Sequence, residues 1–169
     1  MLRVRELAGL ARRLDVAAFE GQMGPFALMQ RPVADVQGRA RRLLTVGLPQ
    51  QVLEKIPSPV EFEELIVAIL PPPQADGTME LVIGRSPESD LVVDDAAVSS
   101  RHATIRWDGA QAVVVDLGSA NGTFVNGKKL SGSVALANGE QLGFGRAHFI
   151  FLPAAELHAR ILRSIHSER

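Results

Sequence analysis

The chain has 169 residues, of which 46% are hydrophobic and 22% are charged, a balance typical of one globular domain or two small ones. Its formal net charge of −1 gives no overall field that would attract nucleic acid or an anionic membrane surface. The absence of cysteine excludes disulfides and thiolate metal sites, and the four histidines have no metal-ligand spacing. We therefore expect no metal and no cofactor.

Targeting features are weak in this sequence. The longest apolar run, Leu65 to Leu70, is far shorter than a membrane-spanning helix requires. Charges among the first residues, beginning with Arg3 and Arg5, break up the apolar core that a signal peptide needs. An arginine-rich transit peptide is the alternative, which the acidic residues Glu6 and Asp15 disfavour. We expect a cytoplasmic protein that binds neither membranes nor nucleic acid.

Residues 1–70 have the pattern of a mainly helical region. The apolar residues of the first helix fall on one face: Leu7, Leu10, Leu14 and Ala17. Gly21 and the pair Gly24–Pro25 end this helix. The next residues, from Pro25 to Gln30, fit either a short strand or an apolar arm. Their sequence does not decide between the two.

Two more helices are expected before residue 70. The first covers Val33 to Val46 and is weakened by Gly38. The second begins at Ser58, with Pro59 at its first position, and runs through the apolar residues Phe62, Leu65, Ile66 and Ile69. Apolar stripes of this kind predict either a small core or a surface that docks a partner, and the residue chemistry leaves both readings open.

A proline-rich linker is predicted at residues 71–77. Three successive prolines cannot continue a helix, and they lack the amide donors that a central strand needs. The linker predicts that the two parts of the chain behave separately, so that a protein starting near Ala75 folds alone. In the alternative, Leu7, Leu10, Leu14 or Phe62 is buried against the C-terminal part or against a second copy of the chain, which would make a homo-oligomer.

Residues 78–152 have the pattern of an all-β domain. Short apolar runs alternate with turn residues, and Asp108–Gly109 and Asn126–Gly127 are strong signals for tight turns. Residues 153–169 are expected to form a closing helix with apolar residues along one side. The predicted fold class is therefore α+β, with a C-terminal antiparallel β-sandwich, a small N-terminal helical region and a C-terminal helix.

Three blocks of small, amide, hydroxyl and arginine residues lie where the predicted strands end. The first is Gly84–Arg85–Ser86, the second runs from Ser99 to Ala103, and the third runs from Asp116 to Gly127. Residues of this kind present a cation and hydrogen-bond donors to an anion.

Together these blocks make residues 78–152 resemble a forkhead-associated (FHA) domain. The resemblance rests on Gly84–Arg85, on Ser-x-x-His at Ser99 to His102, and on Asp-x-x-Ser-x-Asn-Gly-Thr at Asp116 to Thr123, followed by Asn126–Gly127. It covers under half of the chain. It implies an antiparallel sandwich whose loops bind phosphothreonine peptides, with no catalytic residue.

The blocks divide into expected ligand contacts and expected structural supports. The phosphopeptide-binding candidates are Arg85, Ser99, Ser100, Arg101 and Asn121, and the candidates for structural support are Gly84, His102, Gly122 and Asn126. Arg85 supplies a forked charged donor and the serines supply hydroxyl donors, whereas the amide of Asn121 suits a peptide backbone. For Arg101 the sequence leaves open a solvent-exposed position or an ion pair with Asp94 or Asp95.

We predict a signalling adaptor rather than an enzyme. Ser99 or Ser100 beside His102 does not make a catalytic pair, because sequence adjacency does not provide the required geometry. The expected partner is a phosphothreonine protein, either a substrate of a Ser/Thr kinase or such a kinase itself. The rival hypothesis is a scaffold that binds partners independently of phosphorylation. The sequence also leaves open capture of phosphorylated Thr45 by the chain's own domain or by a neighbouring copy.

Overall fold

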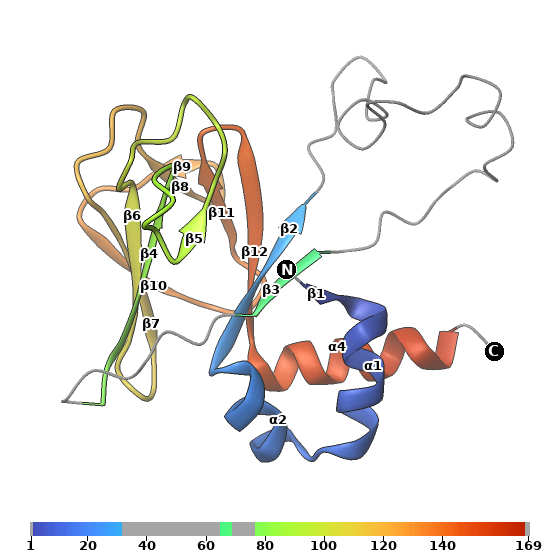
Figure 1. Cartoon of the computed structure of the whole chain (residues 1–169). Helices are drawn as coiled ribbons and strands as arrows, with labels where there is room; N and C mark the ends of the chain where they lie inside the picture. The colour runs from blue at the N-terminus through green and yellow to red at the C-terminus, as the bar shows by residue number, and fades with distance from the viewer. Residues whose placement is uncertain (1, 32–64, 69–76, 168–169) are drawn as a thin grey trace, which may run out of the picture.

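The computed structural model describes residues 2–31, 65–68 and 77–167 of the chain. These residues form two sheets that pack face to face, with helices on the outside of one of them (Figure 1). The helices are α1 (Val4–Arg13), α2 (Val16–Met23) and α4 (Ala154–Ser167). None of these described helices has the length and apolarity needed to cross a membrane.

The two sheets differ in size. Among the described residues, the larger has seven strands in the order β1 (Leu2–Arg3), β3 (Leu65–Ala68), β2 (Phe26–Arg31), β12 (Ala147–Pro153), β11 (Gln141–Phe144), β8 (Thr123–Val125) and β9 (Lys128–Lys129). The smaller has five in the order β10 (Ser133–Leu136), β7 (Ala112–Asp116), β6 (Ala103–Trp107), β4 (Met79–Gly84) and β5 (Leu91–Val92). All described pairings are antiparallel except β4 with β5. The predicted sandwich and C-terminal helix are therefore confirmed.

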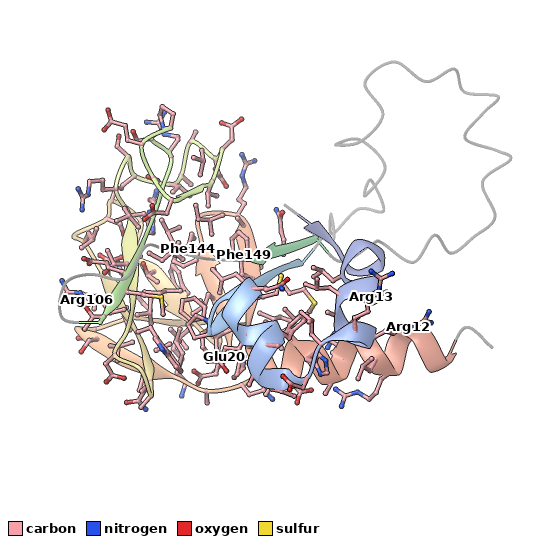
Figure 2. The ribbon with its side chains drawn as sticks, turned by 60° about the horizontal axis from the view of Figure 1, so that its bottom comes forward. Arg12, Arg13, Glu20, Arg106, Phe144 and Phe149 are labelled. Carbon is pink, nitrogen blue, oxygen red and sulfur yellow. The ribbon has the colours of Figure 1, made fainter. Side chains whose placement is uncertain are left out.

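A hydrophobic core fills the space between the two sheets. Inward-facing residues of β4, β6 and β7 meet Phe144, Phe149 and Phe151 from β11 and β12. Figure 2 shows Phe144 and Phe149 inside the molecule, and their ring centroids lie 6.0 Å apart. Because aromatic side chains bury a large apolar area, these rings are a major source of the sandwich's stability.

The larger sheet has a second core on its other face, because β2 and β12 are apolar on both sides. In β2, Phe26 and Leu28 belong to the core between the sheets, whereas Ala27 and Met29 contact the helices. This helical layer buries Leu7, Phe19, Leu157 and Ile161. Figure 1 shows α1, α2 and α4 on the side of β2 and β12 that faces away from the smaller sheet.

Local contacts fix the short helices of this layer. Asp15 caps α2 by accepting a hydrogen bond from the Ala18 amide, and Gly24, with φ of 85°, ends it. The buried His158 of α4 lies 3.0 Å from the Ala11 carbonyl and 3.1 Å from the Leu14 carbonyl through Nε2. Since both partners are acceptors, Nε2 carries the hydrogen and ties α4 to the end of α1.

Two expectations for the N-terminal part are wrong, and one open choice is resolved. The single helix expected through Leu14 and Ala17 is two helices, because α1 ends at Arg13 and Asp15 caps the start of α2. Leu65–Ala68 is strand β3 rather than the end of a helix, because these apolar residues, including β-branched Ile66 and Val67, pair with β2. The segment after Pro25 is a strand that pairs with β12 from Phe26–Pro153 to Arg31–His148. The expected helix at Val33 to Val46, the start of the next helix at Ser58 and the prolines 71–73 lie outside the described residues.

The N-terminal strand should contribute to the stability of the whole sandwich. Leu28 is fully buried in the core between the sheets, so Leu28→Ala should lower the free energy of unfolding by about 2–5 kcal/mol. Urea unfolding measures this loss. The control is Val16→Ala, because Val16 is 41% exposed on α2. Equal stability of the two variants would contradict the assignment of β2 to the sandwich core.

Candidate functional site

The three sequence blocks meet at one end of the sandwich, the upper end in Figure 1. The loop after β4 is joined to the loop before β6 by two backbone bonds, from the Arg85 amide to the Ser99 carbonyl (2.9 Å) and from the Ser86 amide to the Ser100 carbonyl (3.1 Å). A Cβ at Gly84 would collide with the Ser100 carbonyl. The glycine therefore permits the close approach of the two loops.

Arg85 is exposed and is held against the loop before β6 by its side chain. Its Nε donates to the Val98 carbonyl at 3.2 Å. Among the described residues, no carboxylate pairs with its guanidinium, so its terminal nitrogens are available to an anion. A guanidinium anchored through Nε and open at its other nitrogens has the geometry for a forked bond to a phosphate.

Ser99 and Ser100 lie beside Arg85. The Ser99 hydroxyl accepts a hydrogen bond from the Ala120 amide at 3.1 Å, so its own hydrogen remains available for donation. The Ser100 carbonyl accepts from the Ser89 hydroxyl, whereas its side chain is exposed. Arg101 is also exposed, and it forms no ion pair within the described part of the chain. The arrangement offers hydroxyl and guanidinium donors on one short segment.

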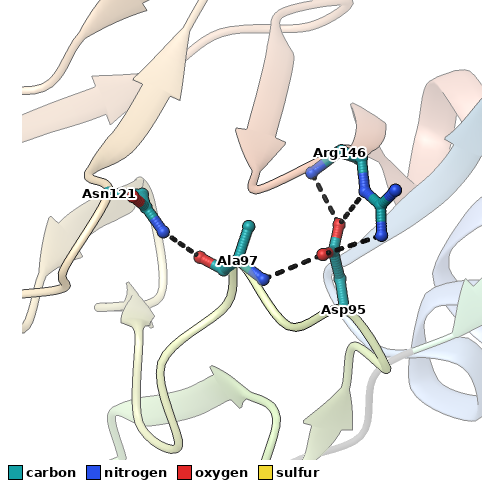
Figure 3. A network of polar contacts seen from close by, with 4 residues as sticks. All are labelled: Asp95, Ala97, Asn121 and Arg146. Atoms are coloured by element: carbon teal, nitrogen blue, oxygen red, sulfur yellow. Dashed lines mark hydrogen bonds and ion pairs between the residues drawn. The ribbon is translucent and has the colours of Figure 1, made fainter.

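Asn121 projects from the loop between β7 and β8. Its Nδ2 donates to the Ala97 carbonyl at 2.8 Å, which connects this loop to the segment that carries Ser99 (Figure 3). The Oδ1 atom and one Nδ2 hydrogen have no partner in the described residues. An exposed amide held in this way can still exchange hydrogen bonds with an extended peptide.

His102 is fully buried and bridges two of the loops. Its Nδ1 accepts from the Ser99 amide at 3.1 Å, and its Nε2 lies 3.1 Å from the Gly122 carbonyl. An amide can only donate, so Nδ1 is the acceptor, and Nε2 must carry the hydrogen that it donates to Gly122. His102 therefore has a bracing position, with both ring nitrogens occupied. Gly122 itself has φ of 88°, a conformation that favours glycine.

Asp116 organises the loop between β7 and β8. Its Oδ1 accepts from the amides of Gly118 and Ser119, and its Oδ2 accepts from the hydroxyls of Ser119 and Thr123. Burial alone would raise the pKa of Asp116, but the hydroxyl bonds and amide bonds outweigh it and lower the pKa to about 2. The loop that carries Asn121 is thus built around a charged carboxylate.

Asp95 connects the segment before Ser99 to Arg146, a residue that lies outside the three sequence blocks. Its carboxylate accepts from the Ala97 amide (2.9 Å), from the Arg146 amide (2.8 Å) and from the Arg146 guanidinium, as drawn in Figure 3. The Ala97 amide bond and then the Arg146 bonds lower the pKa of Asp95 to about 2. Asp95 therefore pairs with Arg146 and not with Arg101. The turn between β11 and β12 braces the segment that ends in Ser99.

Asn126 lies apart from the other site candidates, in the turn between β8 and β9. Its side chain accepts from the Gln141 amide at 2.9 Å and donates to Glu140 at 3.1 Å. Its φ of 51° is in the left-handed region, which asparagine tolerates better than most residues. Asn126 therefore supports the pairing of β8 with β11.

Comparison with known proteins identifies the class of domain. The family model of the FHA domain matches residues 81–145. The chain thus contains a forkhead-associated domain, as the sequence blocks predicted. The crystal structure of the FHA domain of the CT664 protein from Chlamydia trachomatis shares the fold, with a TM-score of 0.52 and 18% identity over 76% of this chain and 97% of that one.

Two curated relatives are more similar in sequence. The chain is 46% identical over 69 residues to the glycogen accumulation regulator GarA of Mycolicibacterium smegmatis, which covers 41% of this chain and 43% of the relative. It is 48% identical over 69 residues to the oxoglutarate dehydrogenase inhibitor of Corynebacterium jeikeium, which covers 41% and 47%. The chain therefore matches less than half the length of each relative. Both relatives are named for regulation, which agrees with a binding domain rather than an enzyme.

Removal of the His102 ring should destabilise the loops and the fold. His102→Ala leaves the Ser99 amide and the Gly122 carbonyl without partners and creates a cavity, so the free energy of unfolding should fall by about 2–4 kcal/mol. Denaturant unfolding gives this quantity. The matched control is His148→Ala, because His148 is exposed on β12. A His102→Ala protein as stable as this control would show that the bridge is dispensable for folding.

The Asp116 carboxylate should make stability depend on acidic pH. Its native pKa of about 2 lies below that of an unfolded aspartate. Its contribution, about 1–2 kcal/mol after allowance for partial exposure, is therefore present above about pH 4 and lost as the pH falls toward 2. Asp116→Asn should be less stable than the wild type at pH 7, and the difference should shrink as the pH falls. Unfolding curves between pH 7 and pH 2 measure it; a difference independent of pH would contradict this account.

Proposed function

We propose that this chain is a phosphothreonine-peptide-binding regulator. In this proposal its FHA domain captures a partner after a Ser/Thr kinase has phosphorylated it, or captures such a kinase itself. The main observation behind the proposal is that Arg85 is held in place and yet leaves its charge open to a ligand. Its Nε donates to the Val98 carbonyl, its backbone amide donates to the Ser99 carbonyl, and its guanidinium has no carboxylate partner among the described residues.

The bonding of the loops supports this function. A phosphate dianion needs a cation and several donors whose positions are set before it arrives, because ordering them on binding would cost conformational entropy. The Ser99 segment is fixed by His102, by the contact of Asn121 with Ala97 and by Asp95. Such a site can bind a short ligand with micromolar affinity.

The names of the relatives support a regulatory output. One is a regulator of glycogen accumulation and the other an inhibitor of oxoglutarate dehydrogenase. By analogy, the complex of this chain with its phosphorylated partner would change that partner's activity or location. The rival function is a scaffold that binds without phosphate. The unpaired guanidinium of Arg85 favours the phosphate-dependent function, because a scaffold has no need of an uncompensated cation at this position.

Binding to phosphopeptides tests the proposal. The full-length protein should bind members of a phosphothreonine library at least ~10-fold more tightly than their unphosphorylated copies. Arg85→Ala removes a charged hydrogen bond and should weaken binding by about 1.5–3 kcal/mol with little change in melting temperature. Isothermal titration calorimetry measures both differences in affinity, and thermal unfolding measures the melting temperature.

A matched arginine variant serves as the control. Arg106 is exposed and pairs with Glu80 on the outer face of the smaller sheet, so Arg106→Ala should bind phosphopeptide like the wild type. Equal binding of phosphorylated and unphosphorylated peptides, with no effect of Arg85→Ala, would overturn the proposed function and favour the scaffold.

A further inference from the structure

Lys129 is a third cation without an acidic partner among the described residues, after Arg85 and Arg101, and it lies close to the candidate site. It lies on strand β9, and a Cβ placed on Gly122 would collide with its Cε and lie 3.1 Å from its Nζ. The end of the Lys129 side chain therefore crosses the backbone directly beside Asn121. None of the sequence blocks indicated this contact, because Lys129 follows the last of them.

The position of Lys129 is fixed by the fold. Its backbone pairs with Phe124 across β8 and β9, and the Leu130 amide donates to the Thr123 carbonyl at 2.8 Å. The residue that it crosses is fixed as well, since the Gly122 amide donates to the Ser119 hydroxyl and the Gly122 carbonyl accepts from His102. The stem of Lys129 thus lies on an ordered backbone and holds the ammonium group at the edge of the loop.

The charge of Lys129 is not neutralised by the protein. Within the described residues, the side chain of Lys129 forms no hydrogen bond or ion pair, and Lys129 is exposed. The carboxylate of the same loop, Asp116, is already occupied by four donors from its own loop. An ammonium group in this situation attracts an acidic group from a bound partner.

Lys129 and the candidate phosphate donors contact different residues of this loop. The Ala120 amide donates to the Ser99 hydroxyl, whereas the Lys129 side chain lies against Gly122. Asn121 stands between these two contacts in the chain. A peptide that meets Arg85 and Ser99 with its phosphate and then passes Asn121 would therefore present a neighbouring side chain, rather than the phosphate, to Lys129.

We propose that Lys129 selects phosphothreonine peptides that carry a glutamate or aspartate close to the phosphothreonine. This proposal rests on the proposed function and deepens it, because it names a chemical feature of the partner beyond the phosphate. One exposed ion pair has a modest effect, so the expected preference for an acidic over a neutral residue is about threefold to fivefold.

Peptide pairs with the full-length protein test the proposal. Each pair carries Glu or Gln at one of about three positions on either side of phosphothreonine, the span that an extended chain needs to cover ~10 Å. The wild type should prefer Glu at one of these positions, and added salt should reduce this preference. Lys129→Met keeps most of the side-chain stem but removes the charge. It should bring the Glu-to-Gln ratio to about one without weakening binding of the Gln peptide.

Two further variants complete the experiment. Lys129→Arg should retain the preference, and so should Lys128→Met, since Lys128 is the adjacent exposed lysine and side chains alternate along a strand. An unchanged ratio in Lys129→Met, or a loss of affinity for both peptides alike, would overturn the proposal. A wild type that binds phosphothreonine peptides without an acidic preference would also overturn it but leave the proposed function intact. A wild type that binds no phosphothreonine peptide would overturn both.

Discussion

The candidate site depends on one buried imidazole. His102 joins the Ser99 amide to the Gly122 carbonyl, so the loop with the hydroxyl donors and the loop with Asn121 are held at a fixed separation. Each loop has its own internal support, Asp95 for the first and Asp116 for the second. The two carboxylates fix the conformation within each loop, and the imidazole fixes the position of one loop relative to the other. The candidate binding side chains can therefore be exposed and open to a ligand, while the groups beneath them form hydrogen bonds within the protein.

This division of roles explains the charges of the site. Both supporting aspartates are held ionised by several donors, with pKa values of about 2. Arg146 is bound to one of them, whereas Arg85, Arg101 and Lys129 have no acidic partner among the described residues. The carboxylates of Asp95 and Asp116 are thus used inside the loops, whereas the three cations remain at the surface, where Glu88 and Asp94 are also exposed. The guanidinium of Arg85, which has no carboxylate partner among the described residues, can bind an anionic ligand although the whole chain has a net charge of −1.

The sequence allowed prediction of what depends on local pattern. Short apolar runs between turn residues predicted the sandwich, and the three blocks at the strand ends, through their resemblance to an FHA domain, predicted the candidate site. Pairings between distant residues could not be derived in this way. Arg146 is 51 residues from Asp95, and its sequence neighbours indicate only a turn. Likewise, the apolar run Leu65–Ala68 suits a helix or a strand equally well, and its pairing with β2 decides for the strand.

The same limit applies to how the two parts of the chain are joined. The prolines at 71–73 indicate a spacer, but a spacer in sequence does not prevent the segment before it from returning to the sheet. Strand β2 lies beside β12 because it offers an apolar residue to each face, Leu28 to the core between the sheets and Met29 to the helical layer. Its last pairing, Arg31 with His148, is two residues from Arg146, which is bound to Asp95. The N-terminal strand is therefore linked to the candidate site through β12 and its turn, because the strands under the helical layer and the turn that holds Asp95 belong to the same seven-stranded sheet.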